Sequence, residues 1–311
     1  MELHPVQAKA PASIMLFGEH SVLRGGHAIL CAIENYITVK ITPQNNNTIH
    51  IISSFGEEKT DKDAISLSHP LRFISESLHL FKKNYSLPSG MIIEVISEID
   101  PTVGLGSSAS LTVALLSALY ASAQQPIEKK QLLQKCYTVI HNVQKVGSGA
   151  DAASIIYGGV IAYTMHNSCV TPLENSFQIA LVYSGSKTPT QKVIEFVNEN
   201  EKRYPKLFSK IFSSIEQATL DAISAINNKD LFSIGSIMNI SHGLMESLLV
   251  GTQELANVRH QLLQETSIYG AKISGSGLGD SVVALGTVSD NFKEKLLPSK
   301  ISQQGVIVTR L

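Results

Sequence analysis

The sequence predicts a two-domain protein that contains both helices and strands. Its 311 residues give enough chain for two domains, each with its own core. Hydrophobic residues make up 43% and charged residues 16%, a balance typical of globular proteins. Strand-like and helix-like hydrophobic patterns both occur, and three glycine-rich loops separate them at residues 101–110, 145–151 and 270–280.

Composition excludes several classes of function. The net charge of −1 and the absence of a Lys/Arg-rich block argue against nucleic-acid binding. Cys31, Cys136 and Cys169 are far apart and odd in number, so we expect buried thiols in a reducing compartment. The N-terminal residues lack a signal-peptide core, and the most apolar predicted helix, 111–123, is too short to span a bilayer. We therefore expect a cytoplasmic, soluble protein with no membrane partner.

Strands are predicted first, from apolar runs and from alternation such as that of Ile37, Val39 and Ile41. An extended segment is expected at 6–16, and strands at 28–33, 37–41, 49–52, 92–96, 160–164, 177–183, 281–285 and 305–309. Residues 55–63 are rich in charge and are predicted to form a surface loop.

Helices are predicted where apolar residues recur every three or four positions, as at Leu71, Ile74, Leu78 and Phe81. Such patterns occur at 71–82, 129–143, 152–156, 190–198, 206–226, 229–238 and 254–266. Polar residues around Pro172 separate two strands, which places the predicted boundary between domains 1–170 and 171–311.

The segment 101–110, PTVGLGSSAS, has the features of a phosphate-binding loop. An apolar strand precedes it, two glycines allow a sharp turn, and Ser107 and Ser108 open a helix whose first N–H groups lack partners. No Lys-Ser/Thr follows the second glycine, and a third spaced glycine is missing, so neither the Walker A nor the Rossmann pattern is present. The alternative is a tight turn with Ser107 as a helix N-cap.

Two further features suit phosphoryl transfer to an alcohol, which needs a phosphate cradle, Mg²⁺ and a group that orients the hydroxyl. The loop 145–151 delivers Asp151, a candidate base, although the same residue type also caps helices well. Glu19 and His20 follow a glycine and suit hydrogen bonds to a substrate, although His20 is equally compatible with a core histidine. Loop 275–279 either closes over the ligands or simply connects two strands.

Three ordered motifs resemble those of the GHMP kinases. Residues 101–110 resemble their central ATP motif, and KISGSGLGD at 272–280 resembles their C-terminal glycine motif, K-x-T/S-G-A/S-G-x-G. Residues 10–23 resemble the N-terminal motif, and GEHSV within it is most similar to the mevalonate kinase branch, as is the pattern from Met238 to Lys272. The resemblance extends over residues 8–285.

The resemblance implies an α+β fold, with an N-terminal domain like ribosomal protein S5 and a ferredoxin-like C-terminal domain. It implies ATP and Mg²⁺ as cofactors and a small alcohol as substrate, which in the mevalonate branch is the C5 hydroxyl of (R)-mevalonate in isoprenoid precursor synthesis. Asp151 would be the catalytic aspartate and Ser108 the hydroxyl at Mg²⁺. The implied nucleotide-binding residues are Pro101, Gly104, Leu105, Gly106, Ser107, Ser108, Ala109, Gly275, Ser276 and Gly277. The implied substrate-binding residues are Glu19, His20, Ser148 and Thr190.

Two residues depart from the mevalonate kinase pattern. Ser13 stands where those kinases usually carry a lysine, and its presence removes a positive charge from the reacting centre; Lys9 and Lys187 are the candidate replacements. Ile140 stands where they usually carry a Mg²⁺-binding glutamate. The metal would then rest on Ser108, phosphates, waters and Asp151.

Two alternatives stay open at this point. Residues 144–159 also resemble phosphomevalonate kinases, which need extra cations for the substrate phosphate, here Arg24, Lys145 or Lys187. The other alternative is a non-catalytic sensor of the same fold, which Ser13 and Ile140 favour and the intact glycine loops and Asp151 oppose. The sequence also leaves open a homodimer and feedback inhibition by downstream isoprenoids.

Overall fold

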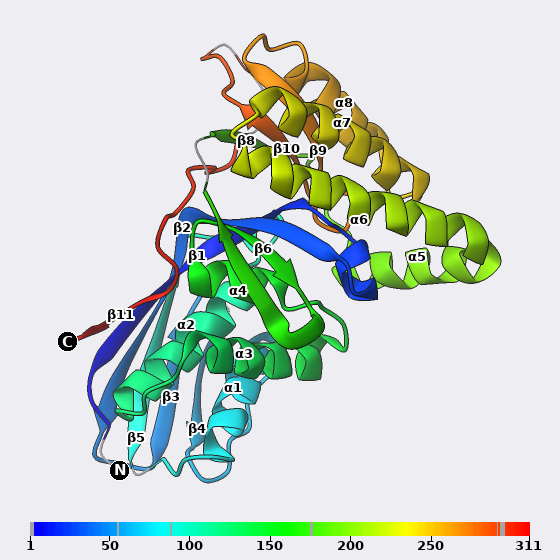
Figure 1. Ribbon diagram of the computed structural model, residues 1–311. Coiled ribbons are helices and arrows are strands. Elements are labelled where there is room, and N and C mark those ends of the chain that lie inside the picture. The colour runs from blue at the N-terminus through cyan, green and yellow to red at the C-terminus, as the bar shows by residue number, and fades with distance from the viewer. Residues whose placement is uncertain (1–2, 55, 88, 175–176, 291, 293–295) are drawn as a thin grey trace.

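The computed structural model describes residues 3–54, 56–87, 89–174, 177–290, 292 and 296–311. Two units, each built on its own antiparallel or mixed sheet, pack against each other (Figure 1). The predicted combination of helices and strands is confirmed, and the fold is of the mixed α+β class. Within the described residues, no helix combines the length and the apolar character needed to cross a bilayer.

The larger sheet has the order β11-β1-β2-β5-β3-β4, and β6 and β7 extend it from one end of β2. Its strands are β1 (Val6–Phe17), β2 (His27–Gln44), β3 (Thr48–Ser53), β4 (Gly56–Asp61), β5 (Gly90–Ser97), β6 (Val160–Thr164), β7 (Cys169–Leu173) and β11 (Ile307–Arg310). Only the β3–β5 pair is parallel among the described pairings. A parallel pair needs a crossover connection, and the segment between these strands contains α1.

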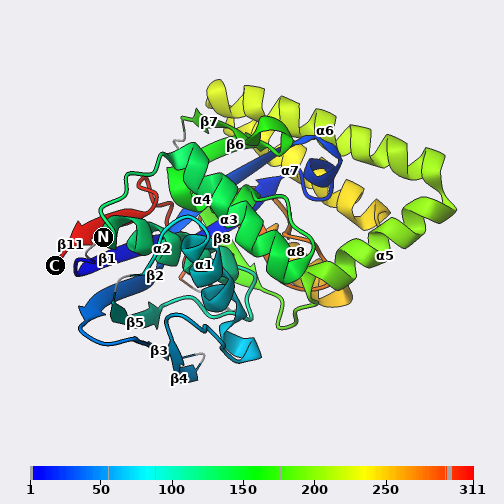
Figure 2. The same ribbon diagram turned by 90° about the horizontal axis from the view of Figure 1, so that it is seen from below.

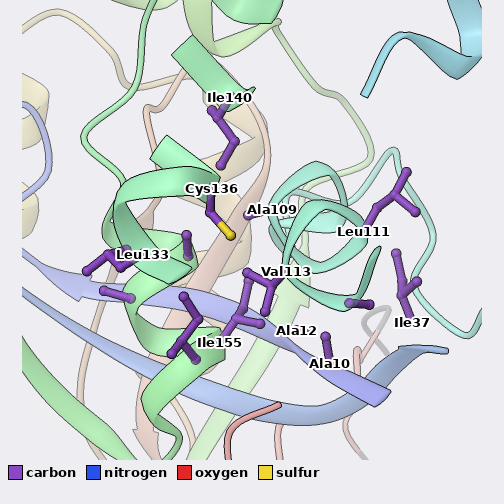
Figure 3. Packing of buried hydrophobic residues seen from close by; sticks show 14 of the residues in the cluster. Ala10, Ala12, Ile37, Ala109, Leu111, Val113, Leu133, Cys136, Ile140 and Ile155 are labelled. Carbon is purple, nitrogen blue, oxygen red and sulfur yellow. The ribbon is translucent and has the colours of Figure 1, made fainter. Parts of the chain in front are cut away.

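Four helices cover one face of this sheet (Figure 2). They are α1 (Arg72–Lys82), α2 (Ser107–Ser122), α3 (Lys129–Gln144) and α4 (Ala150–Tyr157). Helix α2 is buried on nearly all sides, and Figure 3 shows Ala109 and Val113 of α2 near Ala12 of β1 and Cys136 of α3. These small side chains allow close contact between the helix and the strand, which fixes the position of the helix N-terminus.

The second unit is built on a three-stranded antiparallel sheet of order β8-β10-β9. Its strands are β8 (Ile179–Tyr183), β9 (Ile268–Ser274) and β10 (Ser281–Gly286), and its helices are α5 (Thr190–Arg203), α6 (Pro205–Asn227), α7 (Leu231–Ser247) and α8 (Gln253–Leu262). Helices α7 and α8 pack on the sheet, and α6 contacts both α7 and the strands β1 and β2 of the larger sheet. Short 3₁₀ turns occur at η1 (Ser21–Arg24), η2 (His69–Leu71) and η3 (His166–Ser168).

Most predicted helices are present, but several strand predictions were wrong. The predicted loop at 55–63 contains the edge strand β4 (residue 55 itself lies outside the described residues), where charged side chains protect an open edge. The predicted strands 28–33 and 37–41 form one continuous strand, β2. The first part of the predicted loop 270–280 is strand β9, and β7 was not predicted.

The C-terminal strand and the cysteines also add to the sequence-based account. Strand β11 follows the second unit in the chain but pairs with β1 of the larger sheet. The chain therefore returns to the first unit after it has formed the second. The two-domain boundary itself stays a prediction. Cys31 and Cys136 are buried as expected, whereas Cys169 is exposed.

Close packing of α7 on β9 predicts a large cost for a methyl group at Gly235. A Cβ there would lie 2.4 Å from the carbonyl oxygen of Tyr269, whereas one at Gly243 of the same helix meets nothing within 4 Å. We expect Gly235→Ala to lower the free energy of unfolding by about 1–3 kcal/mol through overpacking. Gly243→Ala should raise it by up to about 1 kcal/mol through helix propensity. Urea unfolding of both variants measures the difference; equal effects would contradict the packing argument.

Candidate active site

The loop between β5 and α2 ends at an uncapped helix N-terminus. Gly104 and Gly106 have left-handed φ values of 77° and 69°, and Gly106 is the N-cap of α2. No side chain caps this end, so the alternative in which Ser107 is the N-cap is wrong. Ser107, Ser108 and Ala109 form the first turn and line a cavity, where their N–H groups have no intrahelical partners. This geometry suits a phosphate.

Each glycine of this loop faces a carboxylate. A Cβ on Gly104 would lie 2.8 Å from Oδ1 of Asp280. A Cβ on Gly106 would lie 3.7 Å from Cβ of Asp151 and 3.3 Å from Cβ of Ser13. The absence of side chains at these two positions therefore lets acidic groups from both units approach the loop.

Asp151 lies in the first turn of α4, one residue after Ala150. The N-cap of α4 is Gly149, with φ 80°, and no side chain caps that end, so Asp151 is not the helix cap. Burial raises the pKa of Asp151, while the Ser13 hydroxyl and the Lys187 ammonium act in the opposite direction. A partly buried carboxylate that lines the cavity is suited to accept a proton or to orient a hydroxyl.

Glu19 forms a buried ion pair with Lys272 of β9. Both side chains are almost completely buried, and Lys272 Nζ also donates to the carbonyl of Ile273. Burial raises the pKa of Glu19 and lowers that of Lys272, and their mutual attraction opposes both shifts. Glu19 lines the cavity, but its Oε1 atom is already bound within the protein.

His20 has a left-handed φ of 60° and lies beside the third glycine loop, 270–280. Its Nε2 donates to the carbonyl oxygen of Ser276 at 2.9 Å. Burial lowers the pKa of His20 to about 4, so the imidazole is neutral at neutral pH. A neutral, fixed imidazole at the cavity wall suits a hydrogen bond to a polar substrate better than an ion pair.

One cavity of about 240 Å³ brings together most of the residues predicted for the site. Those that line it are Glu19, His20, Pro101, Gly104, Gly106, Ser107, Ser108, Ala109, Ser148, Asp151, Thr190, Gly275 and Ser276. Leu105 and Gly277 are not among the lining residues. The carbonyl of Leu105 accepts from the Ser13 N–H at 3.2 Å, and Gly277 packs against Val250, so both support the loops from behind.

Sequence reasoning missed the position of Asp280, the last residue of the third glycine motif. Its side chain is 5% exposed, and its Oδ1 atom is buried without a hydrogen-bond partner among the described residues. Burial, with a smaller contribution from Asp151, raises the pKa of Asp280 to about 6, and Lys187 opposes the shift. The one signal in the sequence was an acidic residue that directly follows the glycines of the motif.

Of the two departures from the motif pattern, Ile140 lines this cavity and Ser13 lies behind it. Ser13 is fully buried beside Gly106, and Ile140 presents an apolar side chain to the cavity from α3. In the described part of the chain, no group of three or more His, Cys, Asp or Glu side chains is arranged to hold a metal. A cation at this site would therefore need oxygen ligands from phosphates and water as well.

Comparison with known proteins agrees with this geometry. The family models for the N-terminal and C-terminal domains of GHMP kinases match residues 72–159 and 222–302. The chain belongs to the GHMP kinase family. Members of this family are ATP-dependent phosphotransferases.

Relatives extend over nearly the whole chain. Mevalonate kinase of Pyrococcus abyssi is 28% identical over 98% of this chain and 95% of its own length. The Lin0012 protein of Listeria innocua has a TM-score of 0.85 at 22% identity over 98% of this chain and 99% of its own. Lactococcus lactis galactokinase complexed with galactose has a TM-score of 0.82 at 17% identity, covering 99% and 95%. The shared fold therefore does not identify the alcohol.

The neutral, buried His20 predicts a pH dependence of stability. Its pKa of about 4 in the folded state lies below the ordinary value of 6.5, so the unfolded chain binds a proton first as the pH falls. Wild-type stability should fall between pH 6.5 and 4.5, and His20→Gln should remove about 2–3 kcal/mol of that fall. Chemical unfolding at both pH values measures it. The exposed His166→Gln is the control, and an equal change in that variant would contradict the prediction.

Proposed function

We propose that this protein phosphorylates the C5 hydroxyl of (R)-mevalonate, with ATP as phosphoryl donor and Mg²⁺ as the metal. The full-length relatives named mevalonate kinase support this choice within the family. The observation that carries it is the charge of the cavity: the carboxylates of Asp151 and Asp280 and the ammonium of Lys187 lie at the phosphate loop. The third carboxylate that lines the cavity, Glu19, is neutralised by its ion pair with Lys272.

This charge balance favours a substrate without its own phosphate. Among the described residues that line the cavity, Lys187 supplies the one permanently cationic side chain. Arg24 instead pairs with Glu201 at 2.5 Å and donates to Asn198 Oδ1 at 2.8 Å, and Lys145 is not a lining residue. A phosphomonoester substrate beside the ATP phosphates would need more cations than this cavity offers.

The residues present fit a nucleotide triphosphate with its metal. The glycine loop and the first turn of α2 would hold the phosphates through backbone N–H groups. Ser108 and Asp151 both line the cavity and carry the hard oxygen atoms that Mg²⁺ prefers. When bound, Mg²⁺ neutralises charge on the phosphates.

In this proposal, Lys187 supplies the positive charge that mevalonate kinases usually have at the position of Ser13. Its Nζ atom donates to the carbonyl of Pro101 at 3.1 Å. Its charge opposes the rise in pKa that burial causes at Asp151 and Asp280. An ammonium at this position stabilises negative charge that develops on the transferred phosphoryl group. Lys9, the other candidate, lies 3.9 Å over the ring of Tyr36 and is not a lining residue.

Asp151 acts on the alcohol in this proposal. Its partly buried carboxylate accepts a hydrogen bond from the substrate hydroxyl, orients the oxygen toward the γ-phosphate and receives the proton as the new bond forms. Apolar side chains of Ile140, Ile194 and Met15 line the same cavity and limit the access of water.

Parallel assays of ADP release with saturating Mg-ATP test the substrate. We expect turnover with (R)-mevalonate and none with (R)-5-phosphomevalonate, galactose or homoserine. Turnover with phosphomevalonate alone would overturn the proposal in favour of the next kinase of that pathway. ATP binding without turnover on any of the four alcohols would support the sensor alternative.

Replacing the candidate base should separate binding from chemistry. We expect Asp151→Asn to lower kcat by about 10²–10⁴-fold, because the amide cannot accept the proton, while the Kd for ATP stays within about twofold. Steady-state kinetics and calorimetry measure the two effects. Asp221→Asn on the exposed face of α6 is the control for loss of one carboxylate, and wild-type kcat in Asp151→Asn would rule out the assignment.

Removing the cation at the cavity rim should act on the chemical step. We expect Lys187→Met to lower kcat by about 10²–10³-fold, the size of effect seen when one group that stabilises transition-state charge is lost. Lys192→Met, an exposed lysine on the neighbouring helix α5, should retain wild-type kcat. Single-turnover measurements compare the variants. A normal rate for Lys187→Met together with a slow Lys9→Met would transfer the role to Lys9.

A further inference from the structure

Asp280 occupies an unusual position between the two glycine loops. Its Oδ1 lies 2.8 Å from where a Cβ on Gly104 would be, and its Oδ2 lies 3.3 Å from where one on Gly275 would be. The backbone of Asp280 is held by the loop after β8, through its N–H to Ser186 O at 2.8 Å and its carbonyl to Ser184 N at 2.9 Å. These contacts fix the carboxylate at the wall of the cavity.

This arrangement is costly without a ligand. Asp280 has a left-handed φ of 65°, a conformation that aspartate adopts more readily than most residues with a side chain but less readily than glycine. Its Oδ1 is buried and has no hydrogen-bond partner among the described residues. A buried carboxylate oxygen without a protein partner is unfavourable, and a cation or a hydrogen-bond donor from a ligand in the cavity would satisfy it.

A second carboxylate, that of Asp151 in α4, faces the same loop. Asp280 faces Gly104 and Asp151 faces Gly106, two residues along the chain, so the glycines they contact are at most about 7 Å apart. Between them lies the loop whose N–H groups suit phosphate, a place where unpaired negative charge would repel a nucleotide.

We propose that Asp280 is a ligand, direct or through a bound water, of the divalent cation that accompanies the nucleotide phosphates. In this inference, which rests on the proposed kinase function, Asp280 supplies from the second unit the carboxylate that Ile140 cannot supply from α3. The hydroxyl of Ser108 lines the same cavity from the first unit. A divalent cation would offset the electrostatic repulsion between the two carboxylates and the triphosphate in one cavity.

Calorimetric binding of the β,γ-imido analogue of ATP to the full chain tests the inference. Dissociation constants are measured with Mg²⁺ and with EDTA, and their ratio gives the contribution of the metal. We expect Asp280→Asn to reduce that ratio about 10- to 100-fold, the range seen when groups around a bound metal are removed. Without metal, Asp280→Asn should bind the analogue more tightly than wild type, because one negative charge is gone. Asp290→Asn, an exposed residue, should change neither constant.

A metal ligand is distinguished from a merely structural residue by the change in affinity for the ATP analogue, which should be a loss with Mg²⁺ and a gain with EDTA. Loss of structure would weaken binding in both conditions and lower the melting temperature, whereas removal of an unpaired buried charge should raise the melting temperature of the ligand-free protein. If Asp280→Asn has the same ratio of dissociation constants as wild type, the metal-ligand inference is wrong, but the proposed phosphorylation of mevalonate is not affected by that result. A reduced ratio in a protein that does not phosphorylate mevalonate would support the metal site and reject the proposed substrate.

Discussion

The buried ion pair between Glu19 and Lys272 fixes the position of the two units relative to each other. Each charge alone would carry a large desolvation penalty in this environment, so neither residue is well placed until the other unit is in contact. Two further contacts follow the same seam, from Ser274 Oγ to Met15 O at 2.8 Å and from His20 to Ser276. The candidate active-site cavity lies along this seam, and its shape therefore depends on the pairing.

The cavity has a mixed electrostatic character. Backbone N–H groups at the start of α2 favour anions, and yet Asp151 and Asp280 approach the same loop. Lys187 partly compensates, as its effect on both acids shows. Such a combination is stable in water only at a cost, and it is suited to a ligand that brings both negative oxygens and a metal.

Local sequence predicted the parts of the site that one segment encodes. The loop at 101–110 combines a strand, two glycines and a helix start, and Asp151 follows its own glycine turn, so both were found without the structure. The position of Asp280 depends on how β9, β10 and the loop after β8 meet, which no local pattern specifies. In the same way β4 was missed, because a charged edge strand lacks the apolar alternation used to predict strands.

Strand β11 gives the fold an unusual order of assembly. Val6 pairs with Arg310, and the N–H of Leu311 donates to the carbonyl of Pro5 at 3.1 Å, so opposite ends of the chain share one sheet edge. During synthesis the outer edge of β1 stays open until the ribosome has released the last of these residues, long after β2 is available.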